Sequence, residues 1–94
     1  MPEPRPEKLD TAARLDYLDA ALRAAERREE VSSVIGDAPD SAAARTAVAE
    51  LLAIPLERAQ EVMELRLSRL TQAAVSEMRS ERAAIVARYG DPRG

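Results

Sequence analysis

Residues 59–71 read Ala-Gln-Glu-Val-Met-Glu-Leu-Arg-Leu-Ser-Arg-Leu-Thr, and the interpretation of the whole chain begins with them. We predict a helix over residues 55–69, in which one apolar stripe follows the usual helical spacing. The stripe consists of Met63, Leu67 and Leu70. Val62 and Leu65 stand outside it, so the helix carries apolar groups on more than one face. This surplus predicts a covering layer, formed either by other helices of the chain or by a second copy of it.

The composition of the 94 residues limits the core to small and aliphatic side chains. Phe, Trp, Cys and His are absent, and the two aromatic residues are Tyr17 and Tyr89. A chain of this length buries only about 60–70% of the surface that it exposes when unfolded, so contacts with a partner would add to its stability. Without Cys or His there is no thiol nucleophile, imidazole base, disulfide or zinc finger. We therefore expect a non-enzymatic protein without catalytic, cofactor-binding or metal-ligating residues.

Net charge and the lengths of apolar runs indicate which partners and which cellular location to expect. The formal net charge is −3, and the 14 basic residues are mixed with 17 acidic ones. Direct nucleic-acid binding is not expected, because it normally requires a basic face that neutralises phosphates. No run approaches the roughly 20 apolar residues that span a bilayer, and the N-terminus lacks the apolar segment of a signal peptide. We expect a cytoplasmic protein with no membrane attachment.

Prolines and glycines divide the chain into helices and tails. Three prolines make residues 1–8 a predicted disordered tail. The run Gly36–Ser41 fits the end of one helix and the cap of the next, and Pro55 separates the two helices that follow. Residues 9–89 are expected to form a single all-α domain, followed by a tail over 90–94. Its predicted helices cover residues 9–35, 41–53, 55–69 and 72–89.

The two long helices carry heptad-like apolar seams, the pattern of coiled-coil packing. The short helices 41–53 and 55–69 turn the chain around, so the arms 9–35 and 72–89 should lie antiparallel and bear the short pair as a cap. The residues predicted to pack between the arms are Leu15, Leu18, Leu22, Val75, Met78, Ile85 and Tyr89.

The predicted cap supplies either its own core or the contact between two subunits, and both roles are open at this point. Arginine is enriched at interface cores because its planar fork makes paired hydrogen bonds. The residues predicted for these roles are Leu52, Val62, Met63, Leu65, Arg66, Leu67, Arg69 and Leu70.

The run Arg66-Leu67-Ser68-Arg69-Leu70-Thr71, preceded by Ala59, Val62, Met63 and Glu64, resembles a segment of bacterial type IIA topoisomerase A subunits. These are the DNA gyrase A and topoisomerase IV A chains, whose segment reads approximately Q-A-x-A-I-L-D-M-R-L-x-R-L-T. Less specific matches extend the resemblance over about residues 14–89. The family usually continues Thr-Gly-Leu-Glu, where this chain has Thr71-Gln72-Ala73-Ala74.

In that family the region is a pair of coiled-coil arms ending in a small helical globule. Two such globules meet at the exit gate, the lower dimer interface through which transported DNA leaves, whereas the catalytic parts lie elsewhere. The resemblance thus implies a coiled-coil dimerisation module.

Three functional hypotheses follow. The chain forms a homodimer, or it pairs with a topoisomerase A subunit and modulates DNA topology. Alternatively it is a small DNA-associated structural protein with a composite patch of Arg23, Arg27, Arg28, Arg66 and Arg69.

Overall fold

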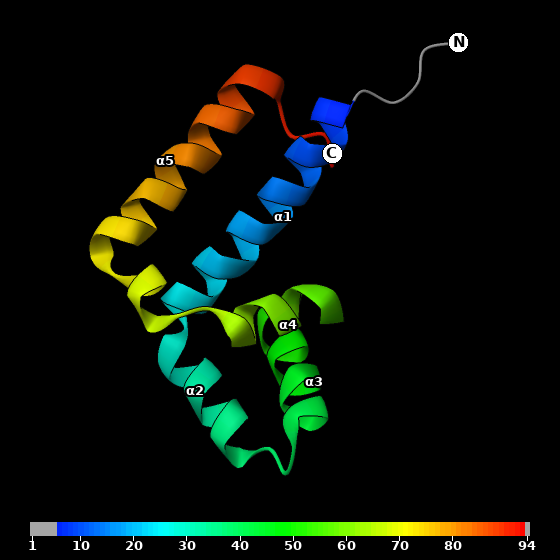
Figure 1. The fold of residues 1–94 in the computed structure, drawn as a ribbon, viewed down its shortest axis with the longest axis vertical. Coiled ribbons are helices and arrows are strands. Elements are labelled where there is room, and N and C mark those ends of the chain that lie inside the picture. The colour runs from blue at the N-terminus through cyan, green and yellow to red at the C-terminus, as the bar shows by residue number, and fades with distance from the viewer. Residues whose placement is uncertain (1–5, 94) are drawn as a thin grey trace.

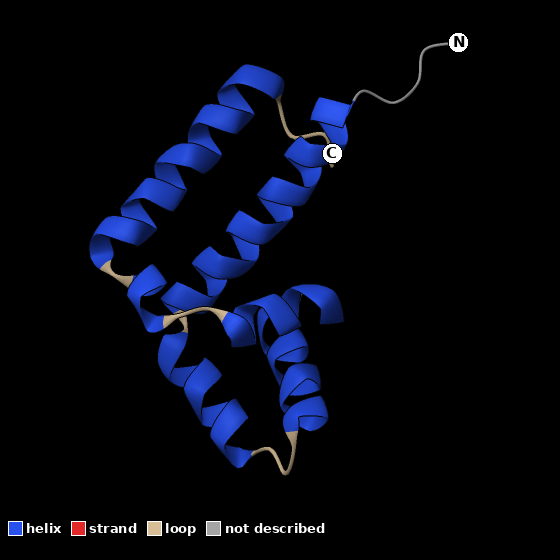
Figure 2. Cartoon of the chain, viewed as in Figure 1, coloured by secondary structure: helices blue, strands red, loops and turns tan. Residues whose placement is uncertain are grey.

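The computed structural model describes residues 6–93, with side chains described from Asp10 onward, and this part of the chain is helical without any strand (Figures 1 and 2). The all-α prediction is confirmed. The elements are α1 (Pro6–Glu26), α2 (Arg28–Asp37), α3 (Ser41–Leu52), α4 (Leu56–Glu64), the 3₁₀ helix η1 (Leu67–Leu70) and α5 (Gln72–Tyr89).

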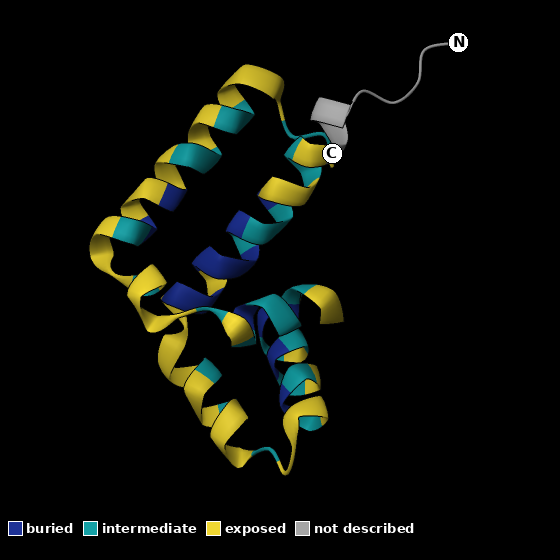
Figure 3. Ribbon diagram, viewed as in Figure 1, coloured by how far each residue is buried: buried dark blue, intermediate teal, exposed yellow. Residues whose placement is uncertain are grey.

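The molecule is elongated and thin. Its principal extents are 49 × 32 × 19 Å and its radius of gyration is 14.7 Å. A compact domain of this length has a radius of gyration of about 12 Å. Because one helix with its side chains is about 10 Å across, a thickness of 19 Å accommodates two layers of helices. Much of each helix is consequently exposed, as Figure 3 shows, and α2 has no buried residue.

Helices α1 and α5 lie side by side and run in opposite directions (Figure 1). Their shared cluster contains Leu18, Leu22, Val75 and Met78, with Ala21 and Ala25 filling the space between the helices. Leu15 is also fully buried, and Ile85 is half-buried against the cluster. The small alanines allow the two helices to approach closely. The predicted arm residues therefore lie buried or, for Ile85, half-buried, with one exception.

That exception is Tyr89, whose side chain is 55% exposed. Its ring lies 5.2 Å from the guanidinium carbon of the neighbouring Arg88. Placing Tyr89 in the packed seam was wrong, because α5 ends with this residue. The chain then turns at Gly90, where φ is +71°, and crosses to α1 (Figure 1).

The single first helix predicted over 9–35 was also wrong. Its backbone leaves the helical region at Arg27, where φ is −122° and ψ is 35°, and α2 starts in a new direction. Val31 and Val34 on α2 pack against the cluster formed by α1, α3 and α4. The bend brings these two valines onto that cluster. A straight helix would carry the valines past it.

Helices α3 and α4 pack on the other side of α1. Their buried cluster contains Val48, Leu52, Ala59 and Val62, together with Ala20 and Ala24 of α1. Asp40 caps α3 by accepting a hydrogen bond from the Ala43 amide at 2.8 Å. Since both clusters use α1, that helix is the shared centre of the fold.

The N-terminal region differs from the predicted tail. Helix α1 begins at Pro6, so residues 6–8 belong to a helix, and a proline suits its first position because no backbone donor is needed there. The rest of the N-terminal tail prediction lies outside the described residues, as does Gly94.

Candidate functional site

The predicted helix over 55–69 ends early, and the difference creates the most distinctive surface of the molecule. Helix α4 stops at Glu64, Leu65 and Arg66 are extended, and η1 follows before Thr71 caps α5. Leu65 and Leu70 both pack against the α1–α5 cluster. Five residues apart on a continuous α-helix, they would point about 140° apart. The extended step allows both side chains to face the same core.

Leu67 lies between these two anchors and points away from the core. Its side chain is 86% exposed, and Arg66, Ser68 and Arg69 beside it are also exposed. The turn itself is ordered by a hydrogen bond of 2.9 Å from the Arg69 amide to the Arg66 carbonyl. We call residues 65–71 the Leu67 turn.

The predicted cap residues are thus divided between core and surface. Leu52 and Val62 are buried, and Met63 is half-buried against the α3–α4 cluster. Leu67 does not share a stripe with Met63 and Leu70, so that part of the prediction was wrong. Leu67 therefore has no role in the subunit core, and the subunit contact is the role that stays open for it.

Beside the Leu67 turn is a hollow of about 210 Å³, which we call the Glu77 hollow. It is lined by Arg14, Arg69, Ala74, Glu77, Met78 and Glu81. Arg14 donates to both carboxylate oxygens of Glu81, with 2.7 Å between Nη2 and Oε1. The hydrogen bond from Arg14 holds the pKa of Glu81 below its usual value. Glu77 and Arg69 form no ion pair with any other residue that the structure describes.

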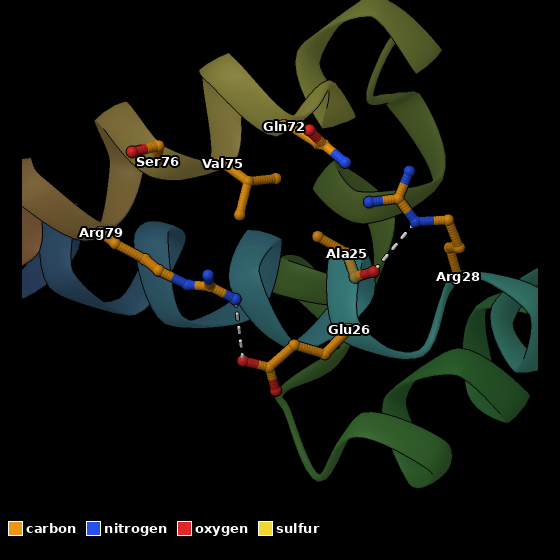
Figure 4. Close-up of a pocket in the computed structure, with 7 residues that line it drawn as sticks. All are labelled: Ala25, Glu26, Arg28, Gln72, Val75, Ser76 and Arg79. Atoms are coloured by element: carbon orange, nitrogen blue, oxygen red, sulfur yellow. Dashed lines mark hydrogen bonds and ion pairs between the residues drawn. The ribbon is translucent and has the colours of Figure 1, made fainter.

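A second hollow, of about 240 Å³, lies between the end of α1 and the first turns of α5 (Figure 4). Its lining residues are Ala25, Glu26, Arg28, Gln72, Val75, Ser76 and Arg79. The Arg79 guanidinium is 3.7 Å from the Glu26 carboxylate, and Arg28 Nε donates to the Ala25 carbonyl at 3.0 Å. With two arginines and one glutamate, this hollow carries an excess of positive charge.

Three arginines of the predicted composite patch also bind backbone carbonyls of this chain. Arg23 donates to the carbonyls of Leu52 and Ala53, both at 3.2 Å, and Arg27 donates to the Leu51 carbonyl at 2.8 Å. These carbonyls lie at the C-terminus of α3, where helical partners are lacking and the helix dipole is negative. Arg28 donates to Ala25 instead. These three arginines keep their positive charge while they bind local carbonyls, and the composite patch of five arginines stays a prediction.

Sequence reasoning missed an ionic cluster around Arg93. The Arg93 guanidinium is 2.8 Å from carboxylate oxygens of Asp16, Asp19 and Asp91, and Arg82 Nε donates to Asp19 at 2.5 Å. Burial raises the pKa of Asp19, but hydrogen bonds from Arg82 and Arg93 outweigh it and leave this pKa lowered. Hydrogen bonds from Arg93 hold the pKa of Asp91 well below its usual value. The cluster fastens the end of the chain to α1.

Two kinds of feature are absent from the described part of the chain. Within it, no cluster of three or more His, Cys, Asp or Glu side chains is arranged to hold a metal ion. Among the helices of residues 6–93, none combines the length and apolar character needed to cross a membrane. In comparisons with known proteins, no family model, no curated protein and no solved structure matches this chain.

Proposed function

We propose that this chain is a non-catalytic protein-interaction module that forms a homodimer through the Leu67 turn. The observation that carries the proposal is the 86% exposure of Leu67 on a turn whose flanking leucines are anchored in the core. An aliphatic or aromatic side chain that projects into a pocket of the partner can anchor a protein interface. The flanking Arg66 and Arg69 are of a residue type that is enriched in interface cores.

The shape of the molecule supports the same proposal. A chain only 19 Å thick leaves its helices covered on few sides, and six of the fourteen buried core residues are alanines. Each alanine buries little apolar area, at about 25 cal/mol per Å². A second subunit would cover the exposed apolar surface and stabilise both copies.

The sequence resemblance of residues 59–71 to topoisomerase A subunits points to dimerisation by an independent route. It also extends the proposal to pairing with a topoisomerase A subunit, which would modulate DNA topology at the exit gate. A pull-down with this chain, followed by a supercoiling assay, tests the extension. If no A subunit is recovered and supercoiling is unchanged, the extension fails and the homodimer proposal stands.

The homodimer is tested by light scattering coupled to gel filtration, at concentrations from about 1 to 100 µM, the range in which weak specific dimers dissociate. We expect the wild-type chain to have the mass of a dimer at the upper end, and Leu67→Ala to have the mass of a monomer. Leu56→Ala is the matched control, because Leu56 is also exposed, at 47%, but lies at the start of α4. A wild-type mass of one subunit throughout would overturn the proposal.

A further inference from the structure

The Leu67 turn and the Glu77 hollow adjoin each other on one surface. Arg69 belongs to η1 together with Leu67, and the same arginine lines the hollow. A protrusion beside a depression is self-complementary under a twofold axis, since residue i of one subunit then meets residue j of the other and the reverse contact forms as well. The surface therefore has the form required for a closed dimer of identical subunits.

The Glu77 hollow has the size and lining to receive a leucine side chain. Its volume is about 210 Å³, whereas a cavity of about 150 Å³ already accommodates benzene, which is larger than the four carbons of a leucine side chain. Ala74 and Met78 provide the apolar part of the lining. Methionine adapts its shape to an incoming group because its unbranched side chain rotates freely.

Charge distinguishes this hollow from the one shown in Figure 4. A docking Leu67 brings Arg66 and Arg69 of its own turn with it. At the second hollow these arginines would meet Arg28 and Arg79, with Glu26 already near Arg79. The Glu77 hollow also contains Arg14 and Arg69, but Glu77 and Glu81 balance their charge, and the Glu77 carboxylate has no ion-pair partner among the residues 10–93. The lining of the second hollow has one more arginine than glutamate, whereas the lining of the Glu77 hollow is balanced and includes an unpaired carboxylate, so the incoming arginines favour the Glu77 hollow.

We infer that two copies of this chain dock with the Leu67 of each subunit in the Glu77 hollow of the other, related by a twofold axis. Arginines of each Leu67 turn then face the Glu77 carboxylate of the opposite subunit. This inference rests on the proposed homodimer and specifies which surfaces meet. It also explains why Leu67 is exposed in a single subunit.

A pair of complementary variants tests the docking directly. Leu67→Ala removes the protrusion, and Ala74→Phe fills the hollow while the backbone amide of residue 74 remains available to its cap, Thr71. Each variant alone should weaken dimerisation at least about tenfold, as truncating an interface anchor does. In an equimolar mixture, the Leu67→Ala subunit keeps its hollow and the Ala74→Phe subunit keeps its Leu67, so one of the two contacts can form. At the other contact of the heterodimer, the short residue 67 of the Leu67→Ala subunit meets the filled hollow of the Ala74→Phe subunit, and the two fit together. The mixture should therefore form heterodimers with an affinity close to that of the wild type.

Native mass spectrometry distinguishes heterodimers from homodimers by mass, and sedimentation equilibrium gives the dissociation constants. Recovery in the mixture, with Leu56→Ala unchanged, supports the inference. A wild-type dimer that Ala74→Phe leaves intact, or a mixture that stays monomeric, overturns it and leaves the homodimer proposal standing. If circular dichroism shows that Ala74→Phe is unfolded, Glu77→Lys replaces it, because Glu77 is exposed and its reversal should also weaken the dimer about tenfold. Unchanged dimerisation of Glu77→Lys would then overturn the inference, whereas a monomeric wild type removes both proposals.

Discussion

Changing Ala53 to glycine should raise the free energy of unfolding and so stabilise the protein. It is the one non-glycine residue with positive φ within residues 6–93, with φ 53° and ψ 51° at the end of α3. A side chain in this left-handed conformation costs roughly 1–2 kcal/mol, because Cβ approaches the following carbonyl oxygen. Glycine removes that cost but gives the unfolded chain more freedom, which costs about 0.4–1 kcal/mol. Since Ala53 is exposed, little packing is lost, and we expect Ala53→Gly to gain about 0.5–1 kcal/mol.

The same chemical change at Ala84 provides the control. Ala84 is exposed in the middle of α5, where glycine costs about 1 kcal/mol relative to alanine. The two variants should therefore shift stability in opposite directions and differ by about 1.5–2 kcal/mol. For a domain of this size, that difference separates the two melting temperatures by roughly 10 °C.

Thermal unfolding followed by circular dichroism at 222 nm measures both variants. All samples need one protein concentration, because a dimer's melting temperature depends on it. Urea unfolding supplies the free energies independently. If Ala53→Gly melts below the wild type, or the two variants shift alike, the left-handed end of α3 is not how the chain turns toward α4, and the reasoning is refuted.

Three further variants examine the core, a helix cap and the ionic cluster. Leu18→Ala leaves a cavity at a fully buried position and should cost about 3 kcal/mol in urea unfolding, a large part of a small domain's stability. Asp40→Ala removes the acceptor for the Ala43 amide and should cost about 1 kcal/mol in the same assay, with exposed Ser41→Ala as its comparison. Arg93→Ala should flatten the acid side of a plot of melting temperature against pH. Because Asp19 and Asp91 have lowered pKa values in the folded state, the stabilisation is present above about pH 4 and is lost as the pH falls below it. An acid limb of equal slope in wild type and variant would contradict the role given to Arg93.

Sequence periodicity predicted burial well wherever a helix is packed along one face. Leu15, Leu18 and Leu22 are separated by three and four residues, and each is buried. Val75 and Met78 follow the same spacing on α5. Such a repeat indicates which side chains share one face of a helix, because the face is set by local helical geometry. It does not record where the helix ends, which explains why Tyr89 was placed in the seam.

The bend at Arg27 has no local signal in the sequence. No proline or glycine lies between Leu9 and Ile35, and the helical hydrogen bonds continue on both sides of Arg27, from the Arg27 amide to Arg23 and from the Val31 amide to Arg27. What favours the bend is contact with residues far along the chain: Val31 and Val34 reach the α3 cluster, and Arg27 reaches the Leu51 carbonyl. The partners of Arg93 were missed for the same reason, since Asp16 is 77 residues away.

The anchored ends of the Leu67 turn also determine how much conformational entropy the turn would lose on association. A flexible loop that presents an apolar residue loses conformational freedom when a partner immobilises it, and this loss reduces the affinity. Here Leu65 and Leu70 already pack in the core, and the Arg66–Arg69 hydrogen bond orders the residues between them. The apolar surplus of residues 59–71 is thereby divided: Leu65 and Leu70 fix the turn in the core, and Leu67 is left exposed at the proposed dimer contact. Association at Leu67 then gains the burial of a side chain while ordering little additional backbone.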